Sequence, residues 1–243
     1  GSFLRTIEST LLVEIEEGVS FSGIGLVSFA KVALEKSKDV IVSCIEDIRG
    51  VLNELSASQF SNVCEETTKE WDKQNEIFEE RLLESLLSSC RLSFKKLLEA
   101  TEDRDGAMFE TKACIRDARL ETSPSVIEVT NALNKMCKDI VEMFKNIAPL
   151  SGKKNKLLFY NAIVSDECIL NSIADIMNKM SMEAFSLRED LNKWDEFRIL
   201  WTRDLSSHTR KQEEKNGEFQ EYLALSESFL AISGGTVMNW FSS

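Results

Sequence analysis

The sequence predicts an all-α protein, an elongated stack of antiparallel helical bundles with one small β-hairpin-like insertion. Gly and Pro, which turns and strand ends require, contribute only 10 and 2 of the 243 residues. Apolar residues recur at spacings of three and four along most of the chain, which is the period of an amphipathic helix. Because 43% of the residues are hydrophobic, the chain has enough apolar side chains to bury a core.

Two long helices are predicted in the first half of the chain. The stripe of the first helix consists of Ile41, Cys44, Ile45, Ile48, Val51, Leu52 and Leu55. The second helix has a stripe between Phe60 and Leu98, which includes Leu82, Leu86, Cys90 and Phe94. Residues 65–76 are highly polar, so we expect this part of the second helix to expose more of its circumference to water.

A short extended segment is predicted after these helices. Gly106 favours a helix end because glycine readily adopts the left-handed conformation. Beyond it, Phe109, Thr111, Ala113 and Ile115 alternate with more polar residues, and this period of two is typical of a strand. We expect the segment to pair with residues 119–122 as a hairpin that rests against helices, because an isolated hairpin is only marginally stable.

The next helix begins near Pro124, and two starting points remain open. Pro124 suits the first helical turn, where its missing N–H would have no partner. Alternatively, Ser125 and Glu128 form a capping box. The predicted buried stripe consists of Val126, Val129, Leu133, Met136, Cys137, Ile140, Val141, Phe144 and Ile147.

The longest apolar stripe follows. It consists of Leu170, Ile173, Met177, Met180, Ala184, Leu187, Leu191, Trp194, Phe197, Trp201 and Leu205. An unbroken helix over this stripe would span about 60 Å, which is long for a globule of this size. We therefore expect a break near Ser181 or Ser186. Trp194, Phe197 and Trp201 share one face, and their pattern favours core anchors over an interface hot spot.

Five parts are predicted along the chain. Residues 1–2 are typical of a pair left by cloning, and residues 3–106 form an N-terminal helical bundle. Residues 107–123 form the extended or hairpin insertion, and residues 124–235 form a C-terminal helical bundle that ends with a helix from Phe219 to Leu230. Residues 236–243 are predicted as a truncated tail that leads to the next element, so we expect the chain to be a piece of a longer protein.

Charge and cysteine usage narrow the function classes. A net charge of −12, without a dense Lys/Arg run, argues against a nucleic-acid binder. The longest uncharged stretch, residues 18–30, is shorter than the ~20 residues of a membrane span. Acidic outer faces favour basic partner surfaces and oppose self-aggregation. Six cysteines without a CxxC pair predict reduced, buried thiols in an intracellular protein.

No specific catalytic or cofactor-binding pattern emerges from the residues. His208 is the only histidine, so a His-rich metal site is not available. Gly23 and Gly25 form a G-x-G without the third glycine, and Gly152-Lys153 lacks the other residues of a phosphate loop. Ordinary turns explain both fragments. The sequence therefore predicts a non-enzymatic segment with no cofactor and no metal.

Two stretches resemble the stem region of dynein heavy chains. The first runs from Phe109 through Ser123-Pro124-Ser125 to Ile140-Val141, and resembles a passage in which an extended segment leads to a Ser-Pro-Ser helix start. The second stretch consists of Tyr160-Asn161-Ala162-Ile163, Asp166-Glu167, Trp194-Asp195-Glu196-Phe197 and Leu200-Trp201-Thr202-Arg203-Asp204. Together they cover residues 107–210 in the order and spacing of the family, and the Ser-Pro-Ser form favours the axonemal branch.

The resemblance implies a non-catalytic structural segment of the stem, with ATP hydrolysis and microtubule binding in other parts of the heavy chain. The structural or interface candidates are Phe109, Pro124, Trp194, Phe197 and Trp201. The implied partners are dynein intermediate or light chains, or a neighbouring heavy chain, in the cytoplasm or cytoskeleton and, for an axonemal chain, in the ciliary axoneme. The alternatives are an unrelated intracellular helical adaptor or tethering scaffold, and an enzyme or ligand-binding bundle with a buried cavity.

Overall fold

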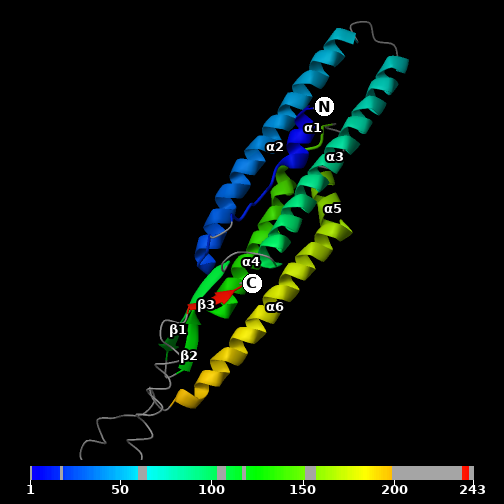
Figure 1. The fold of residues 1–243 in the computed structure, drawn as a ribbon. Helices are drawn as coiled ribbons and strands as arrows, with labels where there is room; N and C mark the ends of the chain where they lie inside the picture. The colour runs from blue at the N-terminus through cyan, green and yellow to red at the C-terminus, as the bar shows by residue number, and fades with distance from the viewer. Residues whose placement is uncertain are drawn as a thin grey trace, which may run out of the picture.

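The computed structural model describes residues 2–16, 19–59, 65–102, 108–116, 119–150, 157–198 and 237–240. Over these residues the protein is mostly helical, with one small antiparallel sheet, as the sequence predicts. The long helices lie lengthwise beside one another in an elongated arrangement, and the sheet lies near one end of it (Figure 1). The prediction of a stack of several bundles stays a prediction.

The two long helices of the first half are α2 (Gly23–Gln59) and α3 (Glu65–Glu102). Ile41, Cys44, Ile45 and Leu52 are buried along α2, as the spacing predicts. The prediction was wrong for Val51 and Leu55, which are 47% and 39% exposed, because this end of α2 has fewer neighbours to cover it. On α3 most described residues between 69 and 76 are exposed, as expected, and Leu82, Leu86, Cys90, Phe94 and Leu97 are buried.

An N-terminal helix, α1 (Ser2–Ser9), packs on both α2 and α3. The segment after α1 buries Leu12 and Val13. Figure 1 shows α1 in the space between the two long helices. The sequence analysis assigned residues 3–106 to one helical bundle, but it did not predict that its first residues would separate the two long helices.

The predicted hairpin is present. Strands β1 (Phe109–Arg116) and β2 (Arg119–Ser123) are antiparallel, with Ala113 opposite Thr122 and Ile115 opposite Leu120. A third strand, β3 (Val237–Trp240), pairs with the other edge of β1, so the strand order is β2-β1-β3. Residues 237–240, which the sequence analysis placed in a tail, thus form a strand of this sheet, because the free edge of β1 offers backbone hydrogen bonds to them.

Of the two starting points considered for the next helix, the capping box is confirmed. Helix α4 (Val126–Glu142) has Ser125 as its N-cap: the Ser125 hydroxyl accepts from the Glu128 N–H, and the Glu128 carboxylate accepts from the Ser125 N–H at 2.7 Å. Pro124 precedes the cap and follows a cis peptide bond. A 3-10 turn, η1 (Met143–Asn146), ends the helix. Most of the predicted stripe is buried, and Val126 and Val141 are half-buried.

The longest stripe forms α6 (Glu167–Lys193), which follows the short helix α5 (Leu158–Val164). The predicted break near Ser181 or Ser186 was wrong, because α6 continues through both residues and ends in the 3-10 turn η2 (Trp194–Phe197). Leu170 was also placed wrongly: it is 48% exposed, and its neighbour Ile169 is buried instead. The stretch predicted as the last helix, Phe219 to Leu230, lies outside the described residues.

One hydrophobic core joins the described elements. Its members range along the chain from Ile7 to Phe197, so residues 3–106 and 124–235 contribute to the same core. Helix α2 packs on α4, and α3 packs on α6 and on α1. Phe94, Phe109, Phe144 and Phe159 are among its largest fully buried side chains. This shared core holds the outer faces of the helices in fixed relative positions.

Candidate functional site

The predicted aromatic positions are core positions in this structure. Phe109 on β1 is fully buried, and Trp194 and Phe197 are 9% and 4% exposed. Trp194 and Phe197 therefore belong to the hydrophobic core. Trp201 lies outside the described residues.

Phe109 and Pro124 lie at the junction between the sheet and the helices. The N-terminal end of α2 reaches this junction through Phe21, whose N–H donates to the Met108 carbonyl at 2.9 Å and which forms a parallel bridge with Phe109. The rings of Phe21 and Phe29 contact each other at a centroid distance of 5.1 Å. Phe109 and Pro124 thus lie at the same junction, whereas Trp194 and Phe197 lie elsewhere, at the end of α6.

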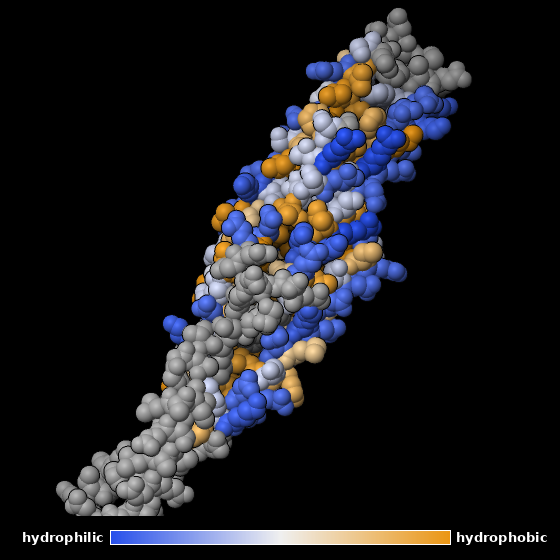
Figure 2. Space-filling model, viewed as in Figure 1, coloured by the Kyte–Doolittle hydropathy of each residue, from blue (hydrophilic) through white to orange (hydrophobic). Residues whose placement is uncertain are grey.

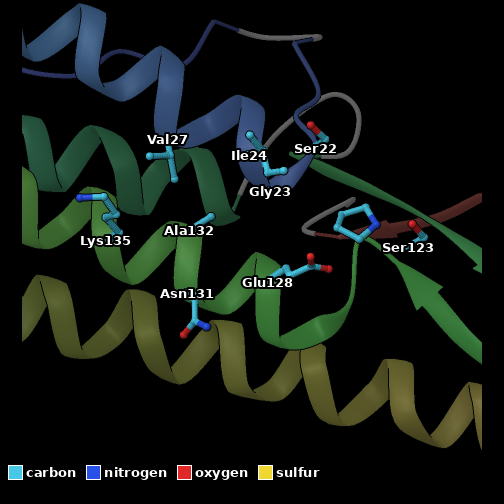
Figure 3. Close-up of a pocket in the computed structure, with 10 residues that line it drawn as sticks. Ser22, Gly23, Ile24, Val27, Ser123, Glu128, Asn131, Ala132 and Lys135 are labelled. Atoms are coloured by element: carbon cyan, nitrogen blue, oxygen red, sulfur yellow. The ribbon is translucent and has the colours of Figure 1, made fainter.

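An open groove of about 480 Å³ lies at this junction. It is lined by Ser22, Gly23, Ile24, Val27, Ser123, Pro124, Glu128, Asn131, Ala132 and Lys135, from the start of α2, the end of β2 and α4 (Figure 3). Its two charged side chains already have partners: Glu128 belongs to the capping box, and Lys135 forms an ion pair with Asp139 at 2.9 Å. Both side chains therefore already form hydrogen bonds or ion pairs at the start of α4 or along it.

Buried serines hold the segment that follows α1. The Ser89 hydroxyl donates to the Thr10 carbonyl at 2.7 Å, and the Ser93 hydroxyl accepts from the Leu12 N–H at 2.9 Å. From the other side, the Ser37 hydroxyl on α2 lies 2.9 Å from the Leu11 carbonyl oxygen. These contacts fix the segment between α2 and α3. Sequence reasoning missed them, although serines that recur every four residues along α3 were the available signal.

An ion pair fixes the start of α6 on α3. Asp166 is the N-cap of α6, and its Oδ1 accepts from the Ile169 N–H at 3.0 Å. The Arg91 guanidinium donates to both oxygens of this carboxylate, at 2.7 and 3.3 Å, and also to Glu84 at 3.0 Å. The hydrogen bonds from Arg91, together with that from the Ile169 N–H, lower the pKa of Asp166. The carboxylate therefore stays ionised while it holds the two helices together.

A second long-range contact connects α2 with the end of η1. The Arg49 guanidinium donates to the Ala148 carbonyl at 2.9 Å and to the Pro149 carbonyl at 3.2 Å. These carbonyls lie in the segment after η1 and its C-cap, and the guanidinium supplies a hydrogen-bond donor for each of them. Arg49 and Arg91 thus fasten the two long helices of the first half to elements of the second half.

The cysteines divide into buried and accessible thiols. Cys44, Cys90 and Cys137 are buried, and burial raises the pKa of each of them, that of Cys137 to about 12. The expectation of buried thiols therefore holds for these three cysteines and fails for two others, because Cys114 is half-buried and Cys168 is exposed. All five described cysteines are free thiols, and Cys64 lies outside the described residues.

Exposed apolar side chains mark the faces that are free to contact other molecules. On α6, Met182 and Phe185 are 73% and 64% exposed, and on α2, Ile24 and Val32 are 79% and 67% exposed. Figure 2 shows orange atoms between blue ones over the elongated surface. Because large apolar side chains gain most from being covered, these helix faces are the best candidates for assembly contacts.

Neither a metal centre nor a membrane span emerges from the described residues. These ranges hold no group of three or more His, Cys, Asp or Glu side chains placed to bind a metal ion. No helix within them is both long enough and apolar enough to cross a membrane. No protein-family model matches the sequence, and no curated protein matches it closely enough to be identified as a relative.

Proposed function

We propose that this chain is a structural segment that acts as a rigid helical spacer and as an assembly surface for other chains. The observation that carries the proposal is the lengthwise packing of long helices around one shared core. Helix α2 alone has 37 residues, which at 1.5 Å per residue span about 55 Å. Long helices packed along their lengths resist bending, because bending would separate side chains that are buried between them.

The contacts between the helices support the spacer role. Arg91 connects α3 to the N-cap of α6, and Arg49 connects α2 to the carbonyls beyond η1. The serine hydroxyls of α2 and α3 hold the segment after α1 between them. Each of these contacts joins residues that are distant in the sequence, so together they oppose sliding of one helix along another.

We further propose that the longer protein is a dynein heavy chain and that this segment belongs to its stem. The two sequence stretches within residues 107–210 support this assignment. Within it, the segment stacks end to end with further helical bundles and contacts dynein intermediate or light chains, or a neighbouring heavy chain. Its location is then cytoplasmic or cytoskeletal, and the ciliary axoneme for an axonemal chain.

An affinity purification tests both the assembly role and the dynein assignment. The tagged protein is incubated with an extract of ciliated cells, and the retained proteins are identified by mass spectrometry. We expect dynein intermediate, light or neighbouring heavy chains among the proteins retained in excess over a tag-only control. Specific recovery of an unrelated trafficking complex would replace the dynein assignment with that of a helical adaptor. Recovery of no specific protein by the folded chain would contradict the assembly role and leave a passive spacer.

A further inference from the structure

The outward face of α6 carries a continuous stripe of exposed residues. They recur at alternating spacings of three and four over 22 positions, which is the spacing of a coiled-coil seam. The stripe consists of Asn171, Asp175, Asn178, Met182, Phe185, Glu189 and Asn192, and each of these residues is exposed. We call this stripe the outer seam. Met182 and Phe185 lie near its middle, with polar or charged residues on both sides.

We propose that the outer seam binds the outer seam of a second copy of this chain, with the two α6 helices antiparallel. The two-fold axis of the pair passes between Met182 and Phe185. In this register Met182 of each copy lies opposite Phe185 of the other, so two apolar contacts form at the centre. A two-fold contact of this kind uses the same surface on both copies and closes on itself.

The polar residues of the outer seam match one another in the same register. Counting outward from the axis, Asn178 lies opposite Glu189 of the second copy, and Asp175 lies opposite Asn192. Each carboxylate therefore faces a carboxamide, whose NH₂ group donates to carboxylate oxygens. A parallel pairing would instead place Asp175 opposite Asp175 and Glu189 opposite Glu189, and like charges at such positions repel. The antiparallel arrangement is thus the one that the charges favour.

The positions beside the outer seam also avoid repulsion in the antiparallel arrangement. Lys179 lies opposite Ser186 of the second copy, and Arg188 lies opposite Ser181. The exposed charged residues of α6 are four acids, Glu167, Asp175, Glu189 and Asp190, and two bases, Arg188 and Lys193. Lys193 pairs with Asp190 at 2.7 Å within the helix.

The pairing is expected to be weak, because Met182 and Phe185 are the only apolar residues that each outer seam contributes. Two 22-residue segments in contact extend over about 33 Å, and stable complexes need more than about 1,000 Å² of buried surface. We therefore expect a monomer–dimer equilibrium that shifts with protein concentration. Salt should strengthen the dimer, since it screens the repulsion between two chains of net charge −12.

Cysteine cross-linking between two single variants tests the register directly. We use Asn178→Cys and Glu189→Cys, each in a Cys168→Ser background, because Cys168 is an exposed thiol on α6. In the antiparallel pair, position 178 lies next to position 189 of the other copy, whereas the two 178 positions are about 16 Å apart along the axis. A disulfide requires Cα atoms within about 7 Å. We expect mild oxidation to produce a covalent dimer in the mixture and not in either variant alone.

Sedimentation measurements over a concentration series test the apolar centre. The double variant Met182→Ser/Phe185→Ser should weaken association by about tenfold or more, while its melting temperature stays that of the wild type, because both side chains are exposed. The matched control is Ile24→Ser/Val32→Ser, which removes two equally exposed apolar side chains from α2 and should leave association unchanged.

Several results would overturn the pairing. Cross-linking of Asn178→Cys with itself would indicate a parallel contact. Sedimentation as a monomer at every concentration would rule out the dimer. If association weakens as salt is added, the protein is instead binding a basic partner that copurified with it. The pairing does not depend on the dynein assignment: a failed cross-link together with recovery of dynein chains would contradict the pairing alone, and the reverse result would contradict the dynein assignment alone.

Discussion

Removal of the Asp166 carboxylate would test how the two halves of the molecule are held together. Asp166 has two roles in the structure, as the N-cap of α6 and as the partner of Arg91 on α3. Asp166→Ala removes both roles. Asp166→Asn keeps an oxygen that can cap the helix but removes the charge, and Arg91→Ala removes the guanidinium and leaves the cap. The three variants therefore separate the two contributions.

The expected magnitudes follow from the surroundings of the pair. Loss of an N-cap costs about 1 kcal/mol of unfolding free energy. The ion pair is only partly shielded from water, since the Asp166 side chain is 11% exposed and the Arg91 side chain is 35% exposed, so we assign it about 1 kcal/mol. Asp166→Ala should thus cost about 2 kcal/mol, and Asp166→Asn and Arg91→Ala about 1 kcal/mol each. For a domain of this size, 2 kcal/mol corresponds to a fall in melting temperature of about 4–8 °C.

Chemical denaturation monitored by circular dichroism at several pH values measures these differences. Because folding lowers the pKa of Asp166, the charge contribution is present above the unfolded pKa of about 3.9 and is lost as the pH falls through the lower folded value. The stability gap between the wild type and Asp166→Asn should therefore be constant near neutral pH and shrink below about pH 4. An Asp166→Ala protein as stable as the wild type would refute the anchoring role, and a gap that grows in acid would refute the assigned charge state.

Three further predictions concern the core and the thiols. Ser93→Ala leaves the buried Leu12 N–H without its acceptor and should lower the unfolding free energy by about 1–3 kcal/mol, measured by urea denaturation. Trp201→Ala should lower it by about 3–5 kcal/mol if this side chain is a core anchor, as the stripe predicts, and an unchanged melting temperature would favour an interface role instead. In the native protein, iodoacetamide should modify Cys168 and leave Cys90 unmodified, because Cys168 is exposed and Cys90 is buried with a raised pKa; mass spectrometry of tryptic peptides measures both.

Each of these measurements has a control in the same chain. Ser181→Ala removes an exposed hydroxyl that bonds within α6, so its effect should stay within about 0.5 kcal/mol. A Ser93→Ala protein no less stable than this control would contradict the role given to Ser93. After denaturation, Cys90 should be modified as readily as Cys168. Equal modification of both thiols in the native protein would contradict the burial of Cys90.

The sequence predicted the β-hairpin and limited the start of α4 to two alternatives, one of which is observed, because local chemistry decides both. Alternating apolar residues and short-range pairing define β1 and β2, and the capping box needs only Ser125 and Glu128. The groove beside Pro124 was not predicted, since it requires the start of α2 to lie against α4, and residues 23 and 128 are far apart in the chain. Strand β3 was missed for the same reason: its partner, β1, lies more than a hundred positions earlier.

The errors on α6 have a different physical cause. The expected break near Ser181 rested on the length of the stripe, but serines inside a helix can bond to their own backbone, and the Ser181 hydroxyl donates to the Met177 carbonyl at 2.9 Å. The helix then ends where the 3-10 turn begins, at Trp194. Leu170 was assigned to the buried side because its spacing to Ile173 fits a helix, yet Ile169 fits equally well. The spacing of apolar residues shows that a helix has a buried stripe. It does not show which of two neighbouring residues at the edge of that stripe faces the core.

The contacts of Asp166 fix the rotation of α6 about its own axis. They therefore also fix the side of α6 on which the outer seam lies. The Asp166 carboxylate is held by Arg91 and bonds to the Ile169 N–H, so the first turn of α6 is oriented with Ile169 toward the core. Every later residue follows at about 100° per position, which places Met182 and Phe185 on the outside. A variant that keeps the cap should therefore keep the seam. In the Asp166→Asn background we expect the mixed cross-link between positions 178 and 189 to persist, and its loss in a protein that stays helical would show that the charge, not the cap, sets the orientation of α6.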